Sequence, residues 1–219
     1  MKLFWTPASP FVRKVMVAAI ECDLDHRLEV HPTYWPHEWA TQTVDFDPQF
    51  IAANPVGRIP TLVTEDGIAL PEANWICSYL DSLLETPRLF PLSGKPHWEM
   101  LRVLAIADGA IEAMILRRAE TLRHPPERSE DFIGKQRARI ARCLDEVEKS
   151  LPAFRESAVD MRHISIAIAC SYMDFRYEAD HWRNGRPVLA AWHERFSQRP
   201  SMTRTQPGET PQSPGRLHR

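Results

Sequence analysis

The sequence has no excess of charge of either sign and no long apolar run. Its 27 lysines and arginines nearly balance its 29 aspartates and glutamates, so the formal net charge is −2. Nucleic-acid binding needs a clustered basic excess, and a membrane-spanning helix needs ~20 consecutive apolar residues. The first residues also lack the apolar stretch of a signal peptide. We therefore expect a cytoplasmic protein with no nucleic-acid partner and no membrane partner.

Glycine and cysteine are scarce, and neither forms a binding motif. The chain has eight glycines and no glycine-rich phosphate-binding pattern. Zinc sites need clustered ligands, whereas the cysteines lie far apart and no two histidines have zinc-site spacing. Isolated cysteines of this kind are typical of small buried side chains in a reducing compartment. We therefore expect no metal. The four cysteines are Cys22, Cys77, Cys143 and Cys170.

Proline is abundant at the start of the chain and rare in its middle. Of the 19 prolines, 11 fall in residues 1–100 and only 3 in residues 101–186. Because proline interrupts helices, the first part should be a mixed α/β domain and the middle a set of long helices. We predict an α/β domain at 1–82, a linker at 83–96, an all-helical domain at 97–204 and a flexible tail at 205–219.

Hydrophobic periodicity supports this division. Short apolar runs bounded by turn residues indicate four strands, and apolar residues at helical spacing indicate one helix after the first strand and one after the fourth. In the second part the apolar stripes are all helical. Strands are predicted at 2–5, 27–31, 61–63 and 68–70, with helices over 12–20, 73–84, 97–115, 140–151, 161–179 and 187–197.

Ser9 and Pro10 begin the first predicted helix. Serine at the N-cap and proline at the first helical position are a strong start signal, and a capping role alone would explain them. Alternatively, the helix N-terminus favours an anion. A hydroxyl there could donate to a bound thiolate and favour its ionised form.

Two further turns carry candidate binding residues. Pro60 directly precedes a predicted strand; a cis Ile59–Pro60 bond would leave the backbone of Ile59 free to pair with a peptide-like ligand, whereas a trans proline suits an edge strand. Glu72 opens the next predicted helix, where an acidic residue suits the helix dipole. With the N–H of Ala73, it could instead hold the ammonium and carboxylate of an amino acid.

These three turns, followed by an all-helical domain, resemble the glutathione S-transferase superfamily, and within it a bacterial YibF-like branch. The resemblance covers roughly residues 1–205. Its motifs are Ser-Pro-Phe-Val-Arg-Lys at 9–14, Asn-Pro-Val-Gly-Arg-Ile-Pro at 54–60, Ala-Asp-Gly at 107–109, Ile-Ala-Ile-Ala-Cys at 166–170 and Asp-Phe-Arg at 174–176.

The resemblance implies a thioredoxin-like first domain that binds glutathione, used as a co-substrate, and a transferase reaction without metal. Ser9 would donate to the glutathione sulfur, and the thiolate would attack a small hydrophobic electrophile. Relatives are usually homodimers. The residues implied in glutathione binding are Arg58, Ile59, Pro60, Glu72 and Ala73. Those expected to line the electrophile pocket are Phe11, Ile111, Met114 and Ile115.

Two positions depart from the family pattern. Ala73 stands where relatives usually have a serine, and the loss of one hydrogen bond to a charged group costs about 1.5–3 kcal/mol; Asn74 could compensate. The helix after Asp160 lacks the acidic residue of a capping box at His163, which is expected to cost about 1 kcal/mol of stability.

Other functions remain open. A glutathione-dependent isomerase, dehalogenase or ether-cleaving enzyme would share every motif. A non-catalytic scaffold that retained the fold is the main alternative, favoured by Ala73, and would fill the expected pocket with its own side chains. Arg117 and Arg118 could steer an acidic substrate or simply lie on a solvated helix face.

Overall fold

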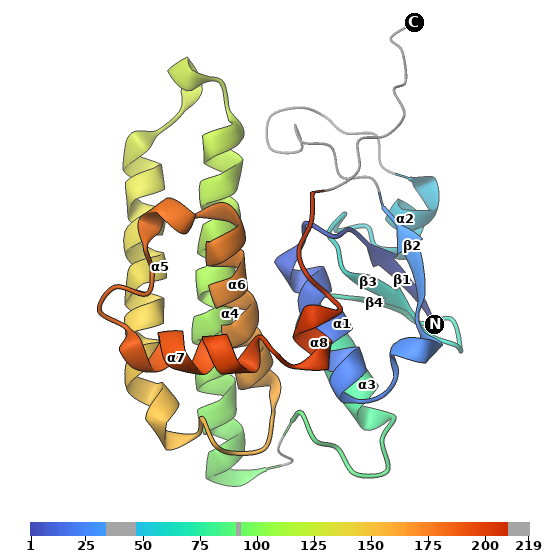
Figure 1. The fold of residues 1–219 in the computed structure, drawn as a ribbon. Coiled ribbons are helices and arrows are strands. Elements are labelled where there is room, and N and C mark those ends of the chain that lie inside the picture. Colours follow the sequence, from blue (N-terminus) through green and yellow to red (C-terminus); the bar gives the residue numbers. More distant parts are fainter. Residues whose placement is uncertain (34–46, 91–92, 210–219) are drawn as a thin grey trace, which may run out of the picture.

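A computed structural model describes residues 1–33, 47–90 and 93–209 of the chain. An α/β domain and a helical domain lie side by side, with the sheet on the side remote from the long helices (Figure 1). This confirms the fold class predicted from the sequence. Among the described residues, no helix is long and apolar enough to cross a membrane.

The α/β domain is built on a four-stranded mixed sheet with the order β2-β1-β3-β4. β1 pairs in parallel with β2 and antiparallel with β3, and β4 is antiparallel to β3. The second and fourth strands along the chain are displaced from their predicted positions by one or two residues, and the first and third match. The strands are β1 (Lys2–Trp5), β2 (Glu29–Pro32), β3 (Thr61–Val63) and β4 (Ala69–Pro71).

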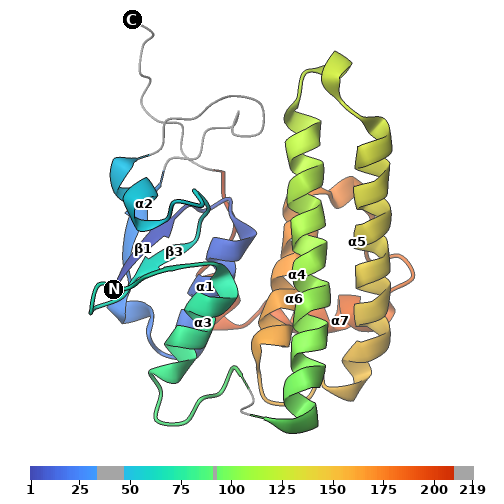
Figure 2. The same ribbon diagram turned by 180° about the vertical axis from the view of Figure 1, so that it is seen from behind.

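Two helices of this domain, α1 (Pro10–Glu21) and α3 (Ala73–Ser82), lie together between the sheet and the helical domain (Figure 2). Because α1 is covered by the sheet, by α3 and by the helical domain, its residues are buried on more than one face, Lys14 included. A short helix, α2 (Pro48–Ala53), follows Asp47 and places Phe50 against Phe4. The sequence patterns did not predict α2.

The helical domain contains two long antiparallel helices, α4 (Gly94–Leu122) and α5 (Glu130–Ser150), which pack against α6 (Met161–Arg176) and α7 (Pro187–Phe196). α4 begins three residues before its predicted start. The prediction that α6 lacks a complete capping box is wrong. The N–H of Asp160 donates to Nδ1 of His163, 3.2 Å away, so the histidine takes the place of the missing acidic residue.

The connection between α3 and α4 is held by one buried carboxylate. Asp81 is 2% exposed and accepts three backbone hydrogen bonds, from Arg88, Leu89 and Phe90, at 2.7–3.0 Å. The carbonyl of Leu89 in turn accepts from the N–H of Met161 at the start of α6. This segment is therefore fixed against both domains.

The end of the chain returns to the first domain. α8 (Pro200–Thr203) packs beside α1 (Figure 1), and Arg199 makes a two-pronged ion pair with Glu21 at 2.7 and 2.9 Å. Residues 205–209 continue past the domain boundary. The Gly208 N–H donates to the Pro7 carbonyl, so this part of the predicted tail is held in place. The rest of that predicted tail, 210–219, lies outside the described residues.

His193 on α7 makes stability depend on pH. Burial lowers the pKa of its imidazole to about 4, whereas in the unfolded chain it is about 6.5. As pH falls below about 6.5, His193 binds a proton in the unfolded state but not yet in the folded state. The stability that neutral His193 contributes is therefore fully present above about pH 6.5 and decreases progressively as pH falls to about 4. Between pH 7 and pH 5 we expect a loss of about 2 kcal/mol in urea unfolding free energy from this residue. In His193→Gln this component should vanish; an unchanged pH dependence would contradict the assignment.

Candidate active site at one edge of the sheet

Strand register brings the three predicted turns to one edge of the sheet. In the antiparallel ladders, Thr61 lies opposite Phe4 near the end of β1 and opposite Pro71 at the end of β4. The turn after β1, the residues before β3 and the turn after β4 therefore meet at that edge. Ser9, Ile59–Pro60 and Glu72 lie in these three segments, and α1 and α3 both begin there.

Ser9 caps α1. Its Oγ accepts a hydrogen bond from the N–H of Val12 at 3.2 Å, and Pro10 occupies the first helical position. The capping interpretation is therefore confirmed. A serine hydroxyl has one proton and two lone pairs, so this bond leaves the proton available to a ligand acceptor. The Ser9 side chain is half-buried.

The Ile59–Pro60 peptide bond is cis. Asn54, 1% exposed, organises the preceding loop: its Nδ2 donates to the Arg58 carbonyl at 2.8 Å and to Thr61 Oγ1 at 2.9 Å. Within the described residues, neither the N–H nor the carbonyl of Ile59 has a hydrogen-bond partner. The loop therefore presents the Ile59 backbone, with the exposed Arg58 side chain beside it.

Glu72 has a left-handed backbone. Its φ is 76°, a conformation that costs a non-glycine residue about 1–3 kcal/mol and concentrates at functional sites. One carboxylate oxygen accepts from the N–H of Asn74 at 3.1 Å, and the side chain is otherwise exposed. The turn thus holds a carboxylate in solvent next to the buried Ala73 and the N-terminus of α3.

A buried polar cluster behind this turn was not predicted. Nζ of Lys14, whose side chain is 0% exposed, lies 2.6 Å from Asp108 Oδ1 and 2.8 Å from Asn74 Oδ1. Asn74 Nδ2 donates to the second Asp108 oxygen at 2.8 Å, and Ser165 donates to the first. Both ends of the Asn74 amide are therefore engaged within this cluster.

The predicted electrophile pocket needs correction. Ile111 and Met114 are both 0% exposed and belong to the hydrophobic core, so neither side chain is accessible to a ligand in this structure. Phe11 and Ile115 are half-buried and pack against that core. The apolar stripe of α4 is buried against the neighbouring helices α5 and α6 and does not line a pocket.

A narrow crevice instead lies directly beside Ser9. It has no internal space wide enough for a water molecule. Tyr172 of α6, Arg13 of α1 and Pro207 from the end of the chain line it. The predicted serine and the end of the chain therefore face the same narrow crevice.

None of the four cysteines has the character of a nucleophile. Burial raises the pKa of the Cys22 thiol to about 11 and raises those of Cys77 and Cys170 further. Burial also raises the pKa of Cys143. Since the thiolate is the reactive form, the site offers Ser9 rather than a protein thiol.

Models of known families match both parts of the chain. The glutathione S-transferase N-terminal domain matches residues 8–83, and the glutathione S-transferase C-terminal domain matches residues 108–195. The chain belongs to the glutathione S-transferase family.

Within the family it falls in the YibF-like branch. The uncharacterized GST-like protein YibF of Escherichia coli K12 is 30% identical over 209 residues, which cover 94% of this chain and 98% of YibF. A glutathione transferase family member from Pseudomonas fluorescens Pf-5, solved with bound glutathione, is 36% identical with a TM-score of 0.87, covering 95% of this chain and 99% of that one.

The same Pseudomonas family member has also been solved with bound S-(propanoic acid)-glutathione. That structure has a TM-score of 0.83 and covers 95% of this chain and 100% of its own. A glutathione S-transferase from Methylobacillus flagellatus with glutathione bound is 26% identical, with a TM-score of 0.83 and coverage of 94% and 99%.

Proposed function

We propose that the protein is a glutathione transferase that activates the glutathione thiol at Ser9. The Ile59 backbone would pair with the cysteinyl backbone of glutathione beside Pro60, and Arg58 would bind the glycyl carboxylate. Glu72 would bind the γ-glutamyl ammonium, with the N–H of Ala73 on its carboxylate. The observation that carries the proposal is the meeting of all three turns at one sheet edge.

The chemistry follows from that arrangement. A hydroxyl that donates to the sulfur, at the positive end of α1, stabilises the thiolate and raises its share at neutral pH. The thiolate attacks an electrophilic carbon held nearby, and the proximity of two bound reactants supplies much of the rate gain. Phe11 and Ile115, both half-buried, are proposed to contact the apolar part of the electrophile.

The proposal includes a cytoplasmic homodimer. Cytoplasmic location agrees with the four free cysteines, which a reducing compartment maintains. Two tryptophans, Trp75 on α3 and Trp98 on α4, are each 67% exposed. Large exposed aromatic side chains are typical of protein interfaces, and a second copy of the chain would cover them.

Glutathione binding tests the proposal directly. We expect isothermal titration calorimetry to detect binding to the wild-type protein at millimolar glutathione or below. Glu72→Gln should weaken it about tenfold, because the amide loses the charge that pairs with the ligand ammonium. The amide oxygen can still accept from Asn74, so the fold should persist. Glu127→Gln, an exposed glutamate near the far end of α4, is the control. No heat of binding at millimolar glutathione would contradict the proposal.

The narrow crevice supports a second candidate, a scaffold protein that retained the fold. A scaffold should have its former pocket filled by its own side chains, and the crevice beside Ser9 has no room for a water molecule. The two functions differ in one measurement: a scaffold shows no glutathione-dependent turnover of any small electrophile in a substrate screen.

A further inference from the structure

Arg117 of the helical domain is buried and has partners within the protein. It is 6% exposed and forms two hydrogen bonds with Asp180, one of them 3.0 Å long. Its guanidinium also lies 4.1 Å from the centroid of the Tyr177 ring. Arg117 therefore lies on no solvated helix face, and its charge is paired inside the fold.

His193 of α7 is also buried, but one of its ring nitrogens has no partner. Its side chain is 5% exposed. Nε2 lies 3.1 Å from the hydroxyl of Ser171, on α6, and 3.2 Å from that of Ser197. Nδ1 is buried and has no hydrogen-bond partner among the described residues. Because a buried polar atom without a partner costs free energy, Nδ1 points to a partner from outside the chain.

A carboxylate oxygen that can accept a further hydrogen bond lies near Nδ1. Oδ2 of Asp174 is 4.0 Å away, which is too long for a hydrogen bond. Oδ1 of Asp174 accepts from Trp182 at 2.7 Å and from Arg183 at 2.6 Å. Within the described residues, Oδ2 accepts from Arg183 alone, at 2.9 Å. Since each carboxylate oxygen can accept two hydrogen bonds, Oδ2 can accept one more.

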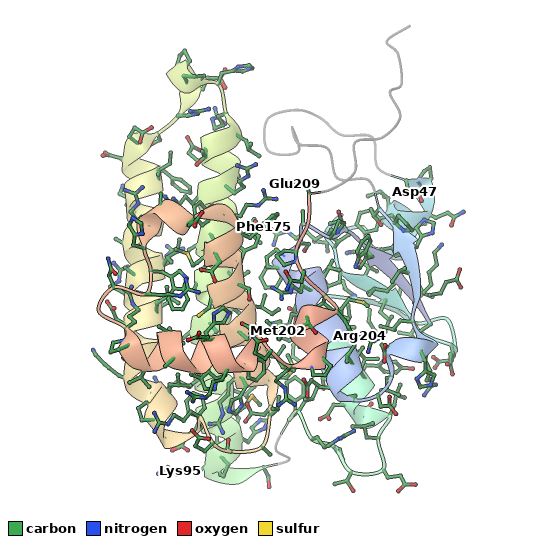
Figure 3. The ribbon with its side chains drawn as sticks, in the orientation of Figure 1. Asp47, Lys95, Phe175, Met202, Arg204 and Glu209 are labelled. Carbon is green, nitrogen blue, oxygen red and sulfur yellow. The ribbon has the colours of Figure 1, made fainter. Side chains whose placement is uncertain are left out.

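Both residues line a groove on the helical domain, where α7 crosses in front of α6 (Figure 3). The groove has a volume of about 620 Å³, within the range of small-molecule sites. Pro187, Ala190 and Ala191 give it an apolar part. It shares no lining residue with the crevice beside Ser9, so it is a separate place on the molecule.

The charged side chains of the groove favour a cation. Two acids, Asp174 and Glu194, and one base, Arg183, line it. Burial lowers the pKa of His193 to about 4, so the imidazole is uncharged at neutral pH. Both Nη atoms of Arg183 are bound to Asp174. The carboxylate of Glu194 is exposed and forms no ion pair with any described residue. A positively charged hydrogen-bond donor would complement this surface.

We propose that this groove binds a small primary amine in its ammonium form. One nitrogen about 2.9 Å from each acceptor bridges Oδ2 of Asp174 and Nδ1 of His193. Because Nδ1 is covered in this structure, the partly exposed Asp174 side chain shifts to admit the ammonium. Glu194 supplies a second negative charge, and Ala190 and Ala191 contact the alkyl part of the ligand. This site does not depend on glutathione.

The proposal fixes the proton on the imidazole. For Nδ1 to accept a hydrogen bond, Nε2 must carry the ring proton and donate it to a serine hydroxyl. Ser171 and Ser197 both lie within reach of Nε2, and a hydroxyl can accept as well as donate. The position of this proton is therefore a measurable consequence of the proposal.

Side-chain NMR of the full-length protein at pH 7.5 tests the site with n-butylamine. The amine is protonated at that pH, since its pKa is about 10, and n-butanol is the neutral ligand of similar size. Long-range ¹H–¹⁵N spectra, with His193→Gln to identify the signals, should show the proton of His193 on Nε2. The Nδ1 signal should shift and saturate with butylamine, at an affinity at least about tenfold above that of butanol.

Three variants locate the binding. Asp174→Asn should abolish the preference for the amine over the alcohol, and Glu194→Gln should weaken amine binding about threefold, as an exposed charge does. Glu178→Gln is the matched control, because Glu178 is an exposed glutamate of the same domain outside the groove. It should change nothing. If Asp174→Asn does not fold, the comparison of Glu194→Gln with Glu178→Gln decides.

Three results would overturn the proposal. The first is a proton on Nδ1 of His193, which would make this atom a donor. The second is equal binding of amine and alcohol by the wild type. The third is an Nδ1 signal that does not move at saturating amine, as expected if a resident water molecule is the missing partner.

Discussion

Replacing Ser9 with alanine is expected to lower the glutathione-conjugating rate constant about a hundredfold, with glutathione still bound. The loss follows because a hydrogen bond to a charged group is worth about 1.5–3 kcal/mol, and the thiolate would lose its hydroxyl donor. The pH profile should shift as well. With the donor gone, the pKa of the bound thiol rises, so the activity should recover partly as pH is raised. A spectroscopic transferase assay between pH 6 and 9 measures both effects.

Two variants separate this role from capping. Ser9→Ala also removes the acceptor for Val12, which costs about 1 kcal/mol of stability. Ser129→Ala removes an equivalent cap, since Ser129 accepts from Phe132 at 3.1 Å at the start of α5. It should lose similar stability and no activity, and Ser9→Thr should keep the cap and part of the rate. Full activity in Ser9→Ala would contradict the proposed mechanism.

Breaking the buried pair of Lys14 and Asp108 is expected to destabilise the protein by about 3–5 kcal/mol. In Asp108→Asn the fully buried ammonium keeps neutral acceptors but loses its only counter-charge within 4 Å among the described residues. Because Asn74 joins this pair to the start of α3, the glutathione affinity should fall as well. Urea unfolding monitored by circular dichroism measures the first effect, and calorimetry the second.

The double variant Lys14→Met with Asp108→Asn provides the sharper comparison. Removing both charges leaves no isolated buried charge, so its loss of stability should be smaller than the sum of the two single losses. The exposed pair of Arg27 and Glu65 is the control, and its removal should cost about 1 kcal/mol or less. Additive losses in the Lys14 and Asp108 series would show that the charges do not depend on each other.

The local signals of the sequence predicted those parts of the site that depend on neighbouring residues. Ser9 and Pro10 alone predicted the start of α1, and Pro60 marked the residue before β3. The structure confirms both positions. The local sequence offered the cis bond and a ligand-binding role of Glu72 only as alternatives, and the resemblance favoured both. The Ile59–Pro60 bond is indeed cis, and Glu72 has a positive φ.

The remaining features depend on contacts between distant parts of the chain. Lys14 and Asp108 are 94 positions apart, and Ser171 and His193 are 22 apart. Hydrophobic periodicity describes one helix at a time, so it indicates neither pairing. A signal for the first was present: Arg13 and Lys14 are the only charges in an otherwise apolar helix before Glu21. The apolar periodicity of α4 correctly predicted that one face of the helix is buried. The error was to expect Ile111 and Met114 to line a ligand pocket rather than the hydrophobic core.

The last helix makes completion of the first domain a late event in synthesis. α8 supplies Arg199 to Glu21 and the Met202 carbonyl to the guanidinium of Arg13, which is 8% exposed. During synthesis, residues 1–82 leave the ribosome long before residues 199–202. Until then, Arg13 and Glu21 of α1 lack these two partners. A chain that ended before residue 199 would lack both of these partners, so we expect it to be less stable than the full chain.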